Sequence, residues 1–340
     1  MSESSPARRL STAWLLVPLL VAAVAIGAWC AYWSIARGRL LAAMDAQVAA
    51  HGAEGRRLEW AGRRVQGFPY RFKVVLDEAR LSSPSGWAVQ APRLEAQANA
   101  YRLTRWVAAA PEGLVVVRPV AGSLRVNGRV LRASLVDARA ARPRVSVEGV
   151  DLTFAPVDGA EPFLLAGAER AELHFRPGTA GDAQLLFRVR QARPRPAGLM
   201  AFVSGNAPTN FVWDARVTDV AQLTGGSWAD AVRRWARADG RMEIVQASLQ
   251  TGDLRAQNKG GVLSVSSDGR LRGRMNVMLN RPLQALSALG RIEQTDPNAL
   301  GAATAVARTR GEADVELSLG FEAGQFTVGP VAVGPAPKVF

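Results

Sequence analysis

The sequence predicts a mainly β protein (α+β), in which an N-terminal transmembrane helix precedes an extended, curved antiparallel sheet or half-open barrel with a few short helices. Three observations predict this fold class. The first is an uncharged apolar run near the N-terminus. The second is the alternation of apolar and polar residues along many short segments, and the third is the presence of Asp-Gly and Asn-Gly pairs between such segments.

The apolar run comprises residues 13–33, and Arg8 and Arg9 precede it. Its 21 uncharged residues would span about 30 Å as a helix, which matches the hydrocarbon core of a bilayer. A cleaved signal peptide is the competing interpretation, but the run is long for one and no small-x-small cleavage motif closes it. We therefore expect a cytoplasmic tail over residues 1–12 and an uncleaved, single-pass inner-membrane anchor over residues 13–33.

A juxtamembrane helix is predicted over residues 34–55. Apolar residues recur there at spacings of three and four, which places them on one face of a helix that ends near Gly52 and Gly55. These residues are Leu40, Leu41, Met44 and Val48. We expect this face to pack against the following domain, and a membrane-surface or partner helix is the alternative.

Residues 56–340 are predicted to form a β-rich extracytoplasmic domain. A half-buried strand is expected over residues 315–321, and hairpins are expected at Asp268–Gly269 and at Asn127–Gly128. The proline-rich stretch 193–198 either divides this domain into two halves or forms a surface loop on one sheet. Further strands are expected at 72–76, 114–117, 145–154, 171–175, 185–189, 211–217 and 242–249.

Two short helices are predicted within the β-rich region. Ser227 and Asp230 resemble a capping arrangement, and the helix they open places Trp228, Val232 and Trp235 on one face. These three side chains are expected to anchor a core, or alternatively to cap an apolar groove. A second amphipathic helix is expected over residues 283–292, after Pro282.

A distinctive motif follows the juxtamembrane helix and consists of Gly67, Phe68, Pro69, Tyr70, Arg71 and Phe72. Because proline favours an extended preceding residue, we expect the three aromatic residues to share one face of a strand and to act structurally rather than in binding. With the anchor before it and the Gly260–Val265 and Gly324–Pro335 segments after it, the motif makes the chain resemble the DUF2125 family of mainly alphaproteobacterial envelope proteins. That resemblance implies a location and a shape, and it carries no known active site.

A second resemblance is to AsmA-type envelope proteins, which also have one N-terminal membrane helix and repetitive β-structure. This resemblance implies an association with lipid traffic and a sheet that curls around an apolar channel.

The charge of +13 does not indicate nucleic-acid binding, because the basic residues are scattered singly and not gathered on one segment. Only three of the 42 basic residues are lysine. No cofactor or metal is expected, since one cysteine and two distant histidines, His51 and His174, cannot supply the usual ligand sets. No catalytic motif is present, so we expect a protein that is not an enzyme.

Three functions remain open. The first is binding of a lipid or another apolar ligand on the curved sheet, which we favour. The second is an envelope scaffold or assembly factor that binds a protein partner through an exposed patch or sheet edge. The third is a hydrolase of unrecognised type, for which His174 is the only extracytoplasmic general base outside the juxtamembrane region.

The orientation of the anchor can be tested with a reporter fused after Phe340. The arginines flank the apolar run on both sides and do not decide the orientation, so we expect the commoner arrangement with an exported C-terminal domain. A phosphatase that folds only outside the cytoplasm should then be active in the fusion, and a cytoplasm-dependent fluorescent reporter should stay dark. The reverse pattern would place the domain in the cytoplasm.

Overall fold

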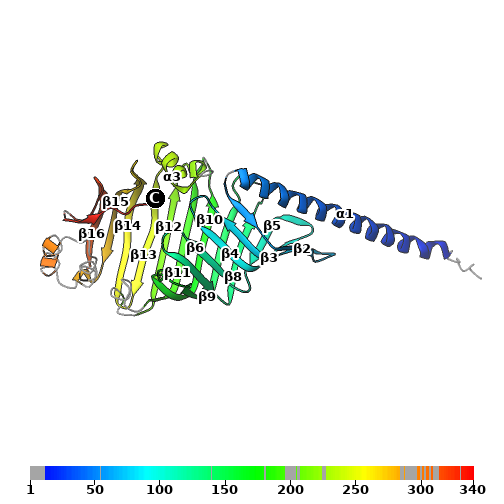
Figure 1. Ribbon diagram of the computed structural model, residues 1–340, viewed down its shortest axis with the longest axis horizontal. Coiled ribbons are helices and arrows are strands. Elements are labelled where there is room, and N and C mark those ends of the chain that lie inside the picture. Colours follow the sequence, from blue (N-terminus) through cyan, green and yellow to red (C-terminus); the bar gives the residue numbers. More distant parts are fainter. Residues whose placement is uncertain are drawn as a thin grey trace, which may run out of the picture.

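The computed structural model describes residues 12–53, 55–138, 140–179, 181–195, 207–223, 227–283, 314–329 and 331–340, with isolated positions at 204, 287, 297–298, 301, 304–305 and 308. One long helix leads into a single antiparallel sheet of 18 strands (Figure 1). The predicted mainly β fold with an apolar N-terminal helix is confirmed. Most of the helix predicted over residues 283–292 lies outside the described residues.

The helices are α1 (Thr12–Ala53), the short 3₁₀ helix η1 (Val220–Leu223) and α3 (Trp228–Arg237). The strands of the first half are β1 (Arg57–Glu59), β2 (Gly62–Gln66), β3 (Arg71–Ser82), β4 (Ala88–Asn99), β5 (Arg102–Ala109), β6 (Leu114–Arg118), β7 (Gly122–Asn127), β8 (Val130–Val136) and β9 (Arg144–Pro156). Those of the second half are β10 (Leu165–Pro177), β11 (Ala183–Pro194), β12 (Thr209–Val217), β13 (Met242–Thr251), β14 (Leu254–Val265), β15 (Leu271–Leu279), β16 (Val315–Glu322), β17 (Gln325–Val328) and β18 (Val331–Pro335).

From β9 to β18 each strand pairs with the next along the chain. The hairpin predicted at Asp268–Gly269 is confirmed, because Val265 pairs with Leu271 on either side of it. Strand β11 ends within the proline-rich stretch at Pro194 and pairs with β12 through Ala192 and Thr209, while residues 196–198 lie outside the described residues.

The hairpin predicted at Asn127–Gly128 is wrong. Strands β7 and β8 lie end to end, and both pair with β9, through Asn127 with Thr153 and Val130 with Val150. Gly128 lies so close to β9 that a Cβ atom there would come within 2.9 Å of the Val150 carbonyl oxygen. At Asn127–Gly128 the chain therefore continues along β9 in close contact with it and does not reverse.

The two faces of the sheet differ in character. Successive side chains of a strand point to opposite faces, so each row of paired residues across the sheet belongs to one face. One row across β8–β13 is entirely apolar: Ala133, Val147, Leu173, Phe187, Trp213 and Ala247. The neighbouring row, on the opposite face, is mainly polar: Arg132, Glu148, Glu172, Arg188, Val212 and Ser248.

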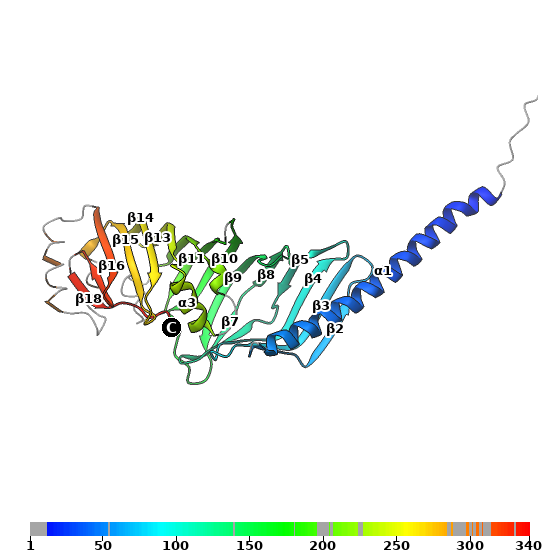
Figure 2. The same ribbon diagram turned by 90° about the horizontal axis from the view of Figure 1, so that it is seen from above.

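Both described α-helices pack on the apolar face and lie on the same side of the curved sheet (Figure 2). Leu40 and Met44 of α1 contact a buried cluster that contains Val74 and Leu76 of β3. The predicted juxtamembrane helix thus continues the apolar segment without interruption, and its stripe meets the sheet. At the other end Trp235 of α3 packs against the ends of several strands.

The predicted capping of α3 is present. Ser227 is the N-cap residue, and its side chain accepts a hydrogen bond from the Asp230 backbone N–H at 3.2 Å. The helix ends at Arg237, before Gly240, whose missing side chain leaves room for the Trp235 ring.

Within the motif, Gly67–Tyr70 form a turn and only Arg71 and Phe72 belong to β3, so the prediction that its aromatic residues share a strand face is wrong. Gly67 has a φ of +102°, and its carbonyl accepts a hydrogen bond from Arg71, which starts β3. The peptide bond between Phe68 and Pro69 is cis. Phe72 is fully buried and stacks on Trp33 of α1 at 5.1 Å between ring centroids, whereas Phe68 and Tyr70 are exposed.

The unequal burial of the motif's aromatic residues predicts unequal contributions to stability. Replacing Phe72 with alanine should lower the free energy of unfolding by about 3–5 kcal/mol, because the truncation leaves a cavity in a packed site. Phe68→Ala is the matched control and should cost about 1 kcal/mol, the value of its edge contact with Trp33. Urea unfolding in detergent, followed by circular dichroism, measures both. Equal losses would contradict a structural role centred on Phe72.

Candidate functional site

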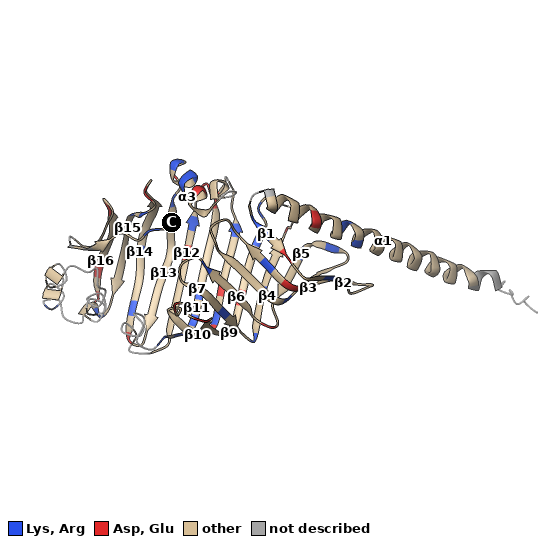
Figure 3. Ribbon diagram, in the orientation of Figure 1, with Lys and Arg blue, Asp and Glu red and all other residues tan. Residues whose placement is uncertain are grey.

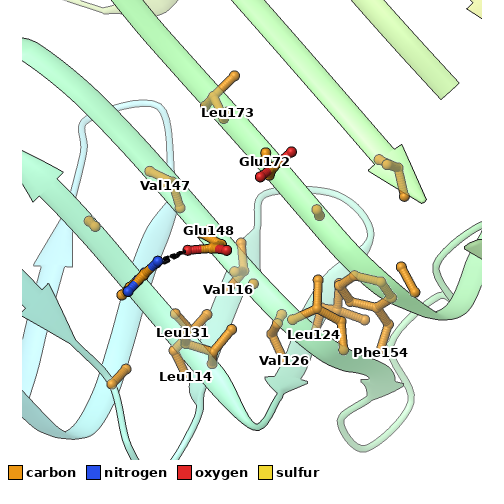
Figure 4. A pocket seen from close by; sticks show the side chains of 18 of the residues that line it. Leu114, Val116, Leu124, Val126, Leu131, Val147, Glu148, Phe154, Glu172 and Leu173 are labelled. Carbon is orange, nitrogen blue, oxygen red and sulfur yellow. Dashed lines mark hydrogen bonds and ion pairs between the residues drawn. The ribbon is translucent and has the colours of Figure 1, made fainter. Parts of the chain in front are cut away.

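The candidate site is an apolar groove of about 500 Å³ on the apolar face of the sheet, formed by strands β4 to β11. Its size falls within the range of small-molecule and lipid sites. Figure 4 shows side chains of several strands converging on it. Large apolar side chains that line the groove include Leu114, Leu124, Leu131, Leu152, Phe154 and Phe187.

Small residues create the hollow. Gly149 of β9 is the direct cross-strand neighbour of Ala171 of β10, and Ala108 of β5 is the neighbour of Ala133 of β8. All four line the groove. Where the surrounding positions carry leucine, valine or phenylalanine, these four have no side-chain atom beyond Cβ, and the Leu152 side chain lies over Gly149, where a Cβ atom would meet it at 2.6 Å. The groove therefore follows from side-chain size as well as from the curvature of the sheet.

Several lining side chains remain accessible to water. Trp87 is 50% exposed, Val147 is 41% exposed and Leu173 is 38% exposed. Two arginines are among the lining residues: Arg118 donates hydrogen bonds to the carbonyls of Gly122, Ala121 and Glu161, and Arg132 forms an ion pair with Glu148. The groove thus offers mainly apolar contact, and the carboxylates of Glu148 and Glu172 are also part of its lining (Figure 4).

The opposite face of the same strands carries a ladder of ion pairs. Glu148 of β9 pairs with Arg132 of β8 and Arg170 of β10, and Glu172 lies 3.7 Å from both Arg170 and Arg188. Burial raises the pKa of Glu148, but the hydrogen bonds and charges of Arg132 and Arg170 outweigh it, so the pKa lies below its ordinary value. The hydrogen bond from Lys73 likewise lowers the pKa of Glu95 on β4.

His174 also lies on this polar face, in a cavity of about 440 Å³. Its Nδ1 atom is 2.9 Å from the Ser146 hydroxyl. A nucleophilic serine requires a histidine that is itself oriented by a third group. The nearby carboxylates of Glu148 and Glu172 are engaged with arginines, and no described contact joins either to His174. The described geometry is that of a polar cross-strand pair.

The residues singled out from the sequence lie outside the groove. The Gly67–Phe72 motif joins the sheet to α1. Val232 and Trp235 are buried at the ends of strands, where the Trp235 indole donates to the Thr218 carbonyl at 2.6 Å. Trp228 is half exposed and donates to the Val339 carbonyl near the C-terminus. Helix α3 therefore borders the apolar face without entering the groove itself.

Sequence reasoning missed the residues that form the groove. Their signal is the coincidence of small residues at positions that become neighbours only after the strands pair, as with Gly149 and Ala171. Among the residues that the structure describes, no group of three or more histidine, cysteine or carboxylate side chains could hold a metal ion.

The fold and the groove define a class of protein with one apolar N-terminal helix and a single curved antiparallel sheet that carries an open apolar face. Within this class the chain belongs to the DUF2125 family, described as "Uncharacterized protein conserved in bacteria", whose model matches residues 33–337. The resemblance inferred from the Gly67–Phe72 motif is thereby confirmed. No curated protein and no solved structure matches the chain.

The ion-pair ladder predicts a specific acid sensitivity. An unfolded glutamate has a pKa of about 4.3, and that of Glu148 is lower in the folded protein. Its stabilising contribution is therefore complete above about pH 4.3 and is lost as the pH falls through the folded-state pKa. In Glu148→Gln we expect lower stability at neutral pH and a shallower decline of the melting temperature below pH 4.

Glu169→Gln serves as the control, because Glu169 is 54% exposed and lies 3.5 Å from its partner Arg190. Exposed pairs of this kind contribute little. Thermal unfolding between pH 3 and pH 7 followed by circular dichroism distinguishes the variants. Identical pH profiles for both would contradict a special role of Glu148.

Proposed function

We propose that this protein is a non-catalytic, membrane-anchored envelope protein that holds the acyl chain of a lipid, or a similarly long apolar ligand, in the groove between α1 and α3. The single observation that carries this proposal is a concave, apolar and partly water-exposed surface on a sheet whose other face is charged. Soluble surfaces seldom leave such a patch without a ligand or partner.

The anchor is supported by the exposure of the first half of α1. One helix of the described residues is long and apolar enough to cross a membrane, and none of its most apolar window is buried by the rest of the chain. Leu19 is 70% exposed and Leu20 is 66% exposed. Figure 3 shows that charged residues enter the helix only in its second half, beside the sheet. Such a surface is stable in hydrocarbon and costly in water.

The energetics favour a long ligand over a small one. Each buried methylene contributes about 0.8 kcal/mol, while association costs at least about 4 kcal/mol in lost translational and rotational freedom. A ligand without polar contacts therefore needs more than about five buried methylenes to bind at all. An acyl chain meets this requirement, and its headgroup would remain in water at an open end of the groove.

The inner membrane and a periplasmic sheet are part of the proposal, since a short N-terminal tail before a single span commonly stays in the cytoplasm. A scaffold that binds an envelope protein is the alternative. Within the described residues, β1 and β2 pair only with β3, and β18 pairs only with β17, and such edges can accept a partner strand. The groove favours a lipid because it is concave and lined by aliphatic side chains.

Ligand binding is tested by placing one charge inside the groove. Val147→Glu should abolish retention of an acyl chain, because the bound chain would have to desolvate a carboxylate. Val107→Glu is the matched control, since Val107 is 38% exposed, against 41% for Val147, and lines the cavity on the polar face. Protein purified in mild detergent is analysed by native mass spectrometry for copurified lipid, and by displacement of a fluorescent fatty acid.

The expected result is lipid on the wild type and on Val107→Glu, and none on Val147→Glu. Equal occupancy of all three proteins, with unchanged melting temperatures, would refute the groove as the binding site. Recovery of a stoichiometric protein partner in place of lipid would favour the scaffold function.

A further inference from the structure

The sheet is attached to α1 at the level where the apolar run ends. The indole of Trp29 donates a hydrogen bond to the Pro69 carbonyl at 3.0 Å, and that of Trp33 donates to the Arg71 carbonyl at 3.4 Å. The hydroxyl of Tyr32 donates to the Ala100 carbonyl at 2.8 Å. Two turns of the sheet, β2–β3 (residues 67–70) and β4–β5 (residues 100–101), therefore lie beside residues 29–33 of the helix.

The two turns form one continuous tip. The Ala100 backbone N–H donates to the Tyr70 carbonyl at 2.8 Å, which joins them directly. Phe68 meets the Trp33 ring edge to face at 5.5 Å. Three hydrogen bonds and two ring contacts, the second being the stacking of Phe72 on Trp33, thus fix the position of the tip along the helix.

The side chains that the tip exposes are aromatic and basic. Phe68 is 53% exposed, Tyr70 is 71% exposed and Tyr101 is 73% exposed. Arg71 and Arg102 are exposed next to them. Aromatic side chains with a polar end favour the layer between headgroups and hydrocarbon, and arginines near that layer attract anionic lipid headgroups.

We propose that this tip, consisting of residues 67–71 and 100–102, is a second membrane contact that inserts into the headgroup layer of the bilayer that α1 spans. The inference rests on the proposed spanning role of α1. If residues 13–33 fill the hydrocarbon core, residues 29–33 lie at its outer boundary, and the tip that is attached to them lies in the interface. A single span leaves the helix free to rotate and tilt in the bilayer, whereas a second contact fixes the orientation of the helix and of the sheet attached to it.

The tip lies at the end of the sheet where the groove begins. Beyond Trp33, α1 continues along β3, and the sheet extends away from the apolar end of the helix (Figures 1 and 2). The strands that begin at the tip, β3 and β5, are close to the groove, which is lined from β4 onward. The tip would therefore hold the start of the apolar face against the membrane surface, where a lipid can enter it.

The test measures depth at single sites in the full-length protein, reconstituted in nanodiscs of zwitterionic and anionic phospholipid. Cys30 is first replaced by alanine. Single cysteines are then introduced as Tyr70→Cys, Tyr101→Cys, Leu20→Cys and Val120→Cys, and each is labelled with a nitroxide. Leu20 reports the span itself. Val120 is 93% exposed in the β6–β7 turn, at the opposite end of the strands from the tip, and is the matched control.

Collision with oxygen, which dissolves in lipid, is compared with collision with a water-soluble nickel chelate by electron paramagnetic resonance. We expect labels at 20, 70 and 101 to be severalfold more accessible to oxygen than to nickel, and the label at 120 to show the reverse. Labels at 70 and 101 that behave like the one at 120, while the label at 20 remains in lipid, would overturn the second contact and leave the anchor intact.

A water-accessible label at 20 would instead refute the anchor, and the inference with it. A lipid-like label at 120 would also overturn the inference, because membrane contact would then not be confined to the tip. Melting temperatures of the labelled proteins are compared with that of the Cys30→Ala parent, so that a misfolded variant is recognised and replaced by labels at Phe68 and Arg102.

Discussion

The structure depends on one constraint, which is that a single-layer sheet has two faces and only one of them suits water. Because side chains alternate along each strand, the row through Val147, Leu173 and Phe187 is apolar while the adjacent row through Glu148 and Glu172 is charged. No second sheet covers the apolar face in the described part of the chain. Helix α1 covers it at one end and α3 borders it at the other, and the uncovered stretch between them is the groove.

The attachment of the sheet to α1 relies on aromatic donors and backbone acceptors. Trp29 and Tyr32 donate to the carbonyls of Pro69 and Ala100 in turns, and Trp33 donates to that of Arg71, the first residue of β3. Each bond therefore satisfies a group on both elements at once. Together with the Arg63–Asp45 ion pair at 2.7 Å, these contacts make the helix and the first strands one unit, so the orientation of the helix determines that of the sheet.

The arginine-rich composition has a structural use on the polar face. Carboxylates there are shared between arginines of neighbouring strands, as Glu148 is between Arg132 and Arg170, and similar pairs join Arg216 to Asp182 and Arg274 to Glu322. Such pairs keep this face hydrated and disfavour its burial against another protein. Binding of a lipid or another partner would therefore gain the most free energy by covering the apolar face.

Local signals determined the apolar N-terminal helix, the hairpin at Asp268–Gly269 and the capped helix at Ser227, because each depends on neighbours within a few residues. Strand β4 had no clear signal, since it contains four alanines and, in Val89, a single β-branched residue of the kind that marks a strand. Only the tertiary structure decided that the chain continues along β9 at Asn127–Gly128 and that Gly149 lies opposite Ala171 on the neighbouring strand. Strand pairing joins residues that are distant in sequence, so the groove exists only after the register of the sheet is set.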